Sequence, residues 1–179
     1  FPGLRQELAD NGALMINAGR DVALQLFGQW RQPYSSAIDV LACSRPLLEH
    51  ALYQRLSAHS RVTFVHDREV VGLCTDERKT QVTGIELRPR NGLSEAGTIV
   101  KASLVVDASG RGSRAPQWLE ALGYTPPAET TVSAQAGYAS RIYQCPPEFN
   151  PGWKALSIMP AAPTATRGGV ILPMEGDRW

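Results

Sequence analysis

The sequence predicts an α/β fold whose second part is rich in β-structure, and three observations lead to this prediction. Apolar residues recur at helical spacing between residues 45 and 58. Short apolar runs separated by polar turns follow between residues 62 and 101, and beyond about residue 125 the apolar runs have almost entirely β character. We therefore assign residues 1–125 to a mixed α/β part and residues 126–179 to the start of a β-sheet domain.

Composition excludes several classes of protein. Of the 179 residues, 43% are hydrophobic and 20% are charged, which is typical of a packed globular chain. The net charge of +1 gives no sign of a nucleic-acid surface. The apolar runs are too short for a transmembrane helix. Three widely spaced cysteines without a C-x-x-C pair, Cys43, Cys74 and Cys145, favour free thiols in the cytoplasm, and the histidines have no metal-ligand spacing.

The first 43 residues predict one helix and three strands. The Asn11-Gly12 pair is a helix-stop signal, and Gly19 separates two apolar runs. Residues 13–36 are also candidates for strands on the substrate side of the fold. The predicted elements are a helix at Leu4–Ala9 and strands at Ala13–Ile16, Asp21–Trp30 and Ile38–Cys43.

An amphipathic helix is predicted at about residues 45–58. Ser44 lies where an N-cap residue belongs, and Pro46 falls in the first turn, where proline is tolerated. Apolar residues recur here at helical spacing, at Leu47, Leu48, Ala51, Leu52 and Leu56.

A β-meander is predicted next. Polar turns separate apolar runs, and a turn is expected at Asn91-Gly92. The predicted strands are Val62–Val65, Glu69–Thr75, Gln81–Arg88 and Gly97–Lys101.

The remainder predicts one more strand-to-helix unit and then β-structure. Leu104–Val106 indicates a buried strand that enters a glycine-rich loop, and Gly123 ends the helix that follows this loop. A linker at Thr125–Ala128 precedes the last three predicted strands, which are Thr131–Gln144, Ala155–Met159 and Gly168–Leu172.

The glycine-rich loop is the strongest candidate for a binding site. Its sequence from residue 107 is Asp-Ala-Ser-Gly-Arg-Gly-Ser-Arg. Glycines allow a ligand close to the backbone, free N–H groups at a helix start favour anions, and Asp107 can accept hydrogen bonds from ribose hydroxyls. The alternative is a tight turn in which Asp107 or Ser109 caps the helix. The loop is neither a G-x-x-x-x-G-K-[ST] nor a G-x-G-x-x-G motif.

Arg45 is a second candidate. A cation at a helix N-terminus opposes the helix dipole, so its presence there favours a nearby anionic ligand. The alternative is a solvated arginine on the first helical turn.

These two motifs, in this order, resemble the flavoprotein aromatic hydroxylase superfamily, which includes p-hydroxybenzoate hydroxylase, squalene epoxidase and the geranylgeranyl reductases. In that superfamily an R-x-x-L helix, here Arg45 to Leu48, is followed by a β-meander and by a strand that ends in the so-called DG motif, here at Asp107. The string from Asp107 to Arg114 is most similar to a bacterial branch near the polyether epoxidases.

The resemblance implies a two-domain FAD-dependent oxidoreductase, of which this chain is an internal fragment. Residues 1–125 would be part of the FAD-binding domain, and residues 126–179 would begin the β-rich substrate domain. Arg45 corresponds to a position that contacts FAD near its phosphates and ribityl chain. The backbone of Val70 corresponds to the position that hydrogen-bonds adenine, and Asp107 to the acid of the DG motif. Ala108, Ser109 and Gly110 complete the implied cofactor-binding set.

The sequence departs from the superfamily pattern in three ways. Ala108 stands where the DG motif has glycine, which puts in doubt a conventional contact with NAD(P)H. The N-terminal G-x-G-x-x-G unit and its ribose-binding acid are absent from these residues, and so is the later Gly-Asp motif that contacts the ribityl chain in the superfamily.

The resemblance implies a monooxygenase that hydroxylates or epoxidises a small organic substrate with FAD, O₂ and NAD(P)H as electron donor. Because the reaction belongs to the flavin, no catalytic side chain is assigned. The alternatives are a flavin reductase of the geranylgeranyl-reductase type and a non-enzymatic β-rich binding module.

Overall fold

The computed structural model describes residues 1–90 and 97–179 and divides into two compact units. Unit 1 comprises residues 1–62 and 138–179, and unit 2 comprises residues 63–137. Unit 1 contains α1 (Leu4–Asp10), β1 (Leu14–Asn17), β2 (Val22–Leu26), β3 (Gln29–Trp30), β4 (Asp39–Ala42), α2 (Arg45–Ser57), β8 (Ala155–Ile158) and β9 (Gly169–Ile171). Unit 2 contains β5 (Arg68–Thr75), β6 (Val82–Pro89), β7 (Thr98–Lys101), a 3₁₀ turn (Gly110–Gly112) and α3 (Ala115–Ala121). The expected turn at Asn91-Gly92 lies outside the described residues.

The core of unit 1 lies between its two helices. Leu8 of α1, Ala13 and Ala51 of α2 are buried and form one apolar cluster. Leu4, Leu41, Cys43 and Leu47 pack against this cluster. At the other end of α2, the Arg55 Nε atom lies 2.6 Å from the Glu7 carboxylate, so an ion pair joins the two helices. The predicted apolar face of α2 is confirmed at Leu47 and Ala51 but is wrong at Leu48, which is exposed.

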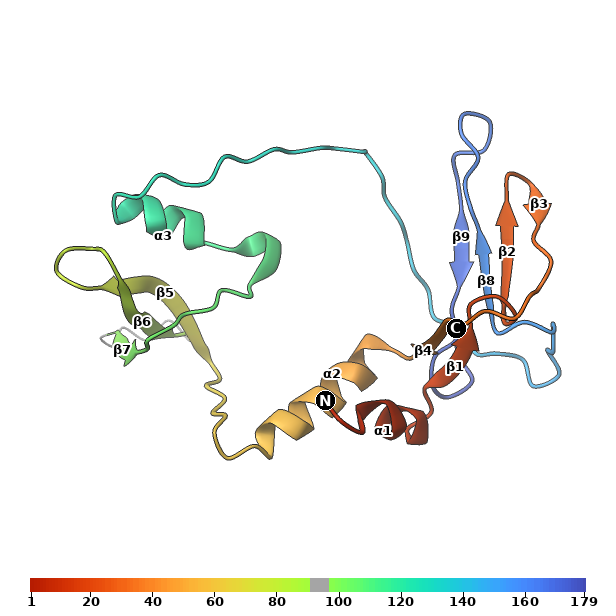
Figure 1. The fold of residues 1–179 in the computed structure, drawn as a ribbon, viewed down its shortest axis with the longest axis horizontal. Helices are drawn as coiled ribbons and strands as arrows, with labels where there is room; N and C mark the ends of the chain where they lie inside the picture. The colour runs from red at the N-terminus through yellow and green to blue at the C-terminus, as the bar shows by residue number, and fades with distance from the viewer. Residues whose placement is uncertain (91–96) are drawn as a thin grey trace. The chain divides into compact units, whose positions relative to one another are not determined.

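Unit 1 also contains two small sheets (Figure 1). Strand β1 pairs antiparallel with β4, and a four-stranded sheet has the order β3-β2-β8-β9. Residues far apart in sequence meet here, because β2 and β8 pair in parallel with Val22 beside Ala155. The run predicted as one strand from Asp21 to Trp30 is instead a hairpin, since Phe27 and Gly28 turn the chain with φ of 50° and 79°.

A polar network lies where β1 leads into β2. Asn17 and Asp21 are both buried. The Asp21 carboxylate accepts hydrogen bonds from the Arg20 guanidinium at 2.9 Å and from the Asn17 backbone N–H at 2.9 Å. Lys154, just before β8, places its Nζ atom 3.1 Å from the same carboxylate. This network ties the β1–β2 turn to β8, and the Arg20 and Asn17 hydrogen bonds hold the pKa of Asp21 well below its usual range.

We expect Asp21→Asn to lower the thermal stability of unit 1 at pH 7. Because the pKa of Asp21 is lower in the folded chain than in the unfolded one, its contribution is complete above the unfolded value, about 3.9. That contribution is lost progressively as the pH falls from about 4 through the lowered pKa of the folded chain. The melting temperatures of wild type and variant should therefore differ more at pH 7 than at pH 3. A difference that is equal at both pH values would contradict this account.

Unit 2 contains an antiparallel sheet in the order β5-β6-β7. Strand β5 is an edge strand and carries a bulge between Val70 and Gly72. Helix α3 follows the 3₁₀ turn and ends at Ala121. Gly123, just after the helix, has a φ of 92°, the left-handed conformation expected after a helix. None of the helices in the described part of the chain is long and apolar enough to cross a membrane.

Three predicted strands are not strands in the structure. In the described residues 1–90 and 97–179, no strand forms at Val62–Val65, Leu104–Val106 or Thr131–Gln144. Within the last of these runs, Gln144 forms an isolated bridge with Arg178. Leu104 and Val106 are each 76% exposed, so the expectation of a buried strand there is wrong. An apolar β-type run becomes a strand only when a neighbouring chain satisfies its backbone N–H and C=O groups.

Candidate functional site

The predicted cofactor-binding residues fall in both units. Arg45 lies at the start of α2 in unit 1. Val70 and the loop Asp107–Gly110 lie in unit 2. The structure brings Val70 and this loop into one compact unit.

The loop is organised around the Asp107 carboxylate. One carboxylate oxygen accepts hydrogen bonds from the Ser109 backbone N–H at 2.9 Å and from the Ser109 hydroxyl at 2.6 Å. The other oxygen accepts a hydrogen bond from the Ser113 hydroxyl. These bonds, led by that of the Ser109 side chain, lower the pKa of Asp107 to about 2. Asp107 is therefore an exposed, ionised acceptor at neutral pH.

The start of α3 depends on Ser113. The Ser113 hydroxyl oxygen accepts a hydrogen bond from the Ala115 backbone N–H at 3.1 Å. It also donates to Asp107, so the loop acid acts on the helix only through this serine. In the structure, neither Asp107 nor Ser109 caps the helix directly. No separate role was assigned to Ser113 from the sequence, although it stands three residues before Pro116 in the first turn of α3, where a serine is a recognisable helix-start signal.

The backbone around Gly110 and Gly112 is open. Gly110 has a φ of 71°, a conformation that residues with a side chain rarely adopt. A Cβ atom added at Gly110 or Gly112 would meet nothing within 4 Å, so neither glycine is required by packing against another described segment. An open backbone beside an ionised carboxylate fits the ribose and phosphate groups of a dinucleotide.

Val70 lies on the edge strand β5, opposite Leu87 of β6. Among the residues that the structure describes, β5 has a strand neighbour on one side only, so it offers backbone groups for a ligand on its other side. The adjacent Glu69 carboxylate lies 3.3 Å from the Arg114 guanidinium, which follows the loop. This exposed ion pair connects the loop to the part of β5 that carries Val70. The geometry thus fits the predicted contact between the Val70 backbone and an adenine ring.

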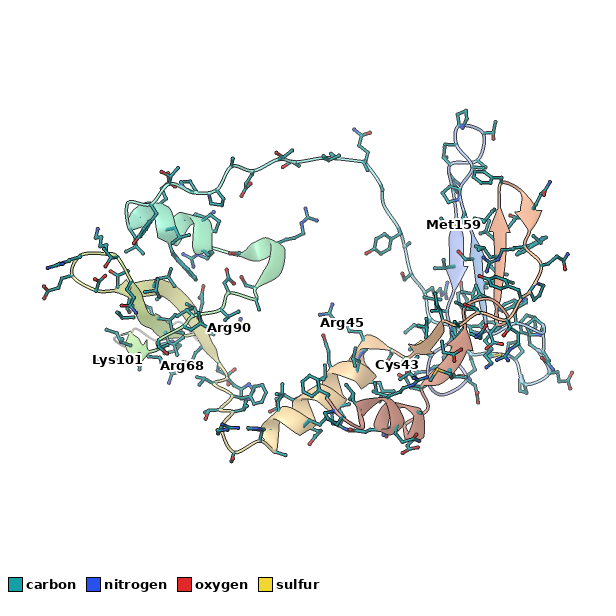
Figure 2. The ribbon with its side chains drawn as sticks, viewed as in Figure 1. Cys43, Arg45, Arg68, Arg90, Lys101 and Met159 are labelled. Atoms are coloured by element: carbon teal, nitrogen blue, oxygen red, sulfur yellow. The ribbon has the colours of Figure 1, made fainter. Side chains whose placement is uncertain are left out.

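Arg45 is the first residue of α2 and is highly exposed, with 86% of its side chain accessible (Figure 2). Its Nε atom lies 2.6 Å from the Glu49 carboxylate one helical turn later. Glu49 raises the pKa of Arg45, so the side chain is a permanent cation. Exposed ion pairs of this type are weak, and a phosphate can replace Glu49 as partner.

Glu175 approaches the same helix start and was not predicted. One of its carboxylate oxygens accepts a hydrogen bond from the Ser44 backbone N–H at 2.9 Å, and the other accepts one from the Ser44 hydroxyl. Burial alone raises the pKa of Glu175, but the Ser44 hydrogen bonds outweigh it and the net shift is downward. Burial raises the pKa of the half-buried Cys43 thiol, and the negative charge of Glu175 raises it further. Residues 131 positions apart show no spacing signal in sequence, so only the fold reveals this contact.

We expect Asp107→Ala to leave the fold nearly intact and to impair retention of FAD, or its reduction by NAD(P)H, in the full-length protein. The variant removes an exposed ionised acceptor but leaves the Ser113–Ala115 hydrogen bond in place. Thermal melts of the apoprotein and flavin-reduction kinetics should be measured on the same preparation. A lower melting temperature with unchanged flavin kinetics would mean that Asp107 only orders the loop.

Comparison with known proteins places the chain in a family. Residues 1–140 match the FAD binding domain family, and the chain belongs to this family. It is also similar to protein Rv3254 of Mycobacterium tuberculosis, with 41% identity over 156 residues. The aligned region covers 82% of this chain and 32% of that relative, so the chain spans about a third of its length. The family match supports FAD as the ligand of this protein.

Proposed function

We propose that the full-length protein is a FAD-dependent monooxygenase that hydroxylates or epoxidises a small organic substrate, with NAD(P)H as electron donor. Family membership supports the flavin. The observation that carries the assignment of the site is the loop in which Ser109 and Ser113 hold Asp107 ionised beside an open glycine backbone. The monooxygenase reaction and the electron donor rest on the resemblance of the Arg45 and Asp107 motifs to the aromatic hydroxylase superfamily.

FAD, when bound, supplies the redox chemistry of such a reaction. The residues of this chain bind and orient it. The Arg45 guanidinium contacts its phosphates, the Val70 backbone contacts its adenine, and the Asp107 carboxylate accepts hydrogen bonds from ribose hydroxyls. Ala108, Ser109 and Gly110 shape the backbone around that contact. The permanent charges of Arg45 and Asp107 keep these contacts independent of pH near neutrality.

We also propose a cytoplasmic location, because the three cysteines, Cys43, Cys74 and Cys145, are all free thiols. The expected partner is a small organic molecule rather than a nucleic acid.

The reaction is tested by following the source of oxygen in the product. The full-length protein is reduced with NAD(P)H without oxygen and then mixed with ¹⁸O₂ and a panel of phenols and alkenes. A monooxygenase yields a product that carries one labelled oxygen atom. A product that has gained two hydrogen atoms and no oxygen would favour the geranylgeranyl-reductase type instead. A protein that never binds flavin would be the non-enzymatic module.

A further inference from the structure

Glu175 lies against the first turn of α2, the helix that carries Arg45. Its carboxylate accepts two hydrogen bonds from Ser44, one from the backbone N–H and one from the hydroxyl. The Ser44 hydroxyl in turn accepts a hydrogen bond from the Leu47 backbone N–H at 3.2 Å and so caps the helix. Glu175 therefore contacts the capping residue directly through two separate groups.

The first turn of α2 is a favourable place for an anion. Backbone N–H groups there lack partners within the helix, and the helix dipole places partial positive charge at this end. Arg45 adds a full positive charge at the first helical position, and the first turn holds no acidic residue. The Glu175 carboxylate, contributed from 131 residues along the chain, supplies a negative charge at the Ser44 cap, while Glu49 pairs with Arg45 itself.

Glu175 is itself held in place. The Arg178 Nε atom donates to the Glu175 carbonyl oxygen at 3.0 Å, and the Arg178 guanidinium lies 3.6 Å from its carboxylate. On another side Gly12 approaches so closely that an added Cβ would lie 3.1 Å from the Glu175 Cβ. Only 19% of the Glu175 side chain is exposed. The carboxylate is thus fixed before any ligand binds.

We propose that Glu175 is a positioning residue for the flavin. Its fixed carboxylate holds the Ser44 cap and the first turn of α2, and through them keeps the Arg45 guanidinium where it contacts the FAD phosphates. The proposal rests on the proposed function, since it requires that Arg45 bind FAD. It assigns to Glu175 no contact with the cofactor.

A double-mutant cycle on FAD affinity in the full-length protein tests this. The apoproteins of wild type, Arg45→Ala, Glu175→Gln and the double variant are titrated with FAD. We expect Glu175→Gln to weaken binding roughly tenfold in the wild-type background and by less than about twofold when Arg45 is already alanine, because residues that act on one another are not additive. Equal effects in both backgrounds would overturn the proposal and leave the proposed function intact. If Arg45→Ala leaves FAD affinity unchanged, the flavin contact itself fails and this proposal fails with it.

Two further variants separate positioning from general stability. Glu7→Gln breaks the ion pair at the opposite end of α2 and should leave FAD affinity unchanged. Ser44→Asp, combined with Glu175→Gln, returns a carboxylate to the N-cap and should restore most of the lost affinity. Loss of affinity in Glu7→Gln, or no rescue by Ser44→Asp, would show that Glu175 acts only through packing. If Glu175→Gln does not fold, Ser44→Ala, which removes one of the two contacts to Glu175, takes its place in the cycle with the same expectations.

Discussion

Replacing Arg45 with alanine should weaken FAD binding by the full-length protein roughly ten- to a hundredfold, the loss typical of one charge-assisted hydrogen bond. The side chain is exposed and its internal partner Glu49 is on the same helix, so its removal should barely affect folding. Titration calorimetry of the apoprotein with FAD measures the loss directly.

Arg88→Ala is the matched control for that experiment. Arg88 is also an exposed arginine paired with a nearby glutamate, Glu86, at 3.0 Å, but it belongs to strand β6 and to no predicted contact with the flavin. Its replacement should leave FAD affinity unchanged. If Arg45→Ala behaves as Arg88→Ala does, the assignment of Arg45 to the cofactor is wrong.

A polypeptide of these 179 residues alone should bind FAD no more tightly than millimolar. The Arg45 side chain, the Val70 backbone and the Asp107 loop offer only a few hydrogen bonds, each with a net value of about 0.5–3 kcal/mol. Association itself costs about 4–15 kcal/mol, so little or no favourable free energy is left. The helix start after a G-x-G-x-x-G turn, where a pyrophosphate rests in many dinucleotide-binding proteins, is not in this sequence.

Equilibrium dialysis of the 179-residue polypeptide against FAD tests this expectation. The same preparation should also self-associate, because apolar side chains such as Val132 and Leu104 are 88% and 76% exposed. Micromolar affinity, or a polypeptide that purifies with FAD bound, would contradict the prediction. It would mean that residues 1–35 contribute a phosphate site that their sequence does not reveal.

Local signals in the sequence predicted the helices and their boundaries well. Ser44 caps α2 and Pro46 lies in its first turn, as expected, because capping depends only on residues within one turn. Gly123 lies just after the end of α3 for the same kind of local reason. Strands β1, β4, β5, β6, β7, β8 and β9 also lie close to their predicted positions.

Predictions that depended on distant partners were less successful. Leu104–Val106 and Thr131–Tyr143 have the composition of strands, but strand formation requires a neighbour that composition does not supply. The parallel pairing of β2 with β8 was likewise not predicted, since no local sequence signal indicates that Val22 and Ala155 are neighbours.

The same distinction applies to the candidate site. The hydrogen bonds from Ser109 and Ser113 to Asp107 span two and six residues, and the motif that contains them was recognised in sequence. The contact between Glu175 and Ser44 spans 131 residues and was not. Local motifs therefore identified the loop, and only the fold identified the carboxylate that supports Arg45.

The central claim is that this chain supplies part of a FAD site, and the flavin content of the full-length protein tests it most directly. The purified protein should be yellow, and denaturation should release one FAD per chain, with less retained by Arg45→Ala and Asp107→Ala. A colourless wild-type protein that takes up no FAD on titration would contradict the claim.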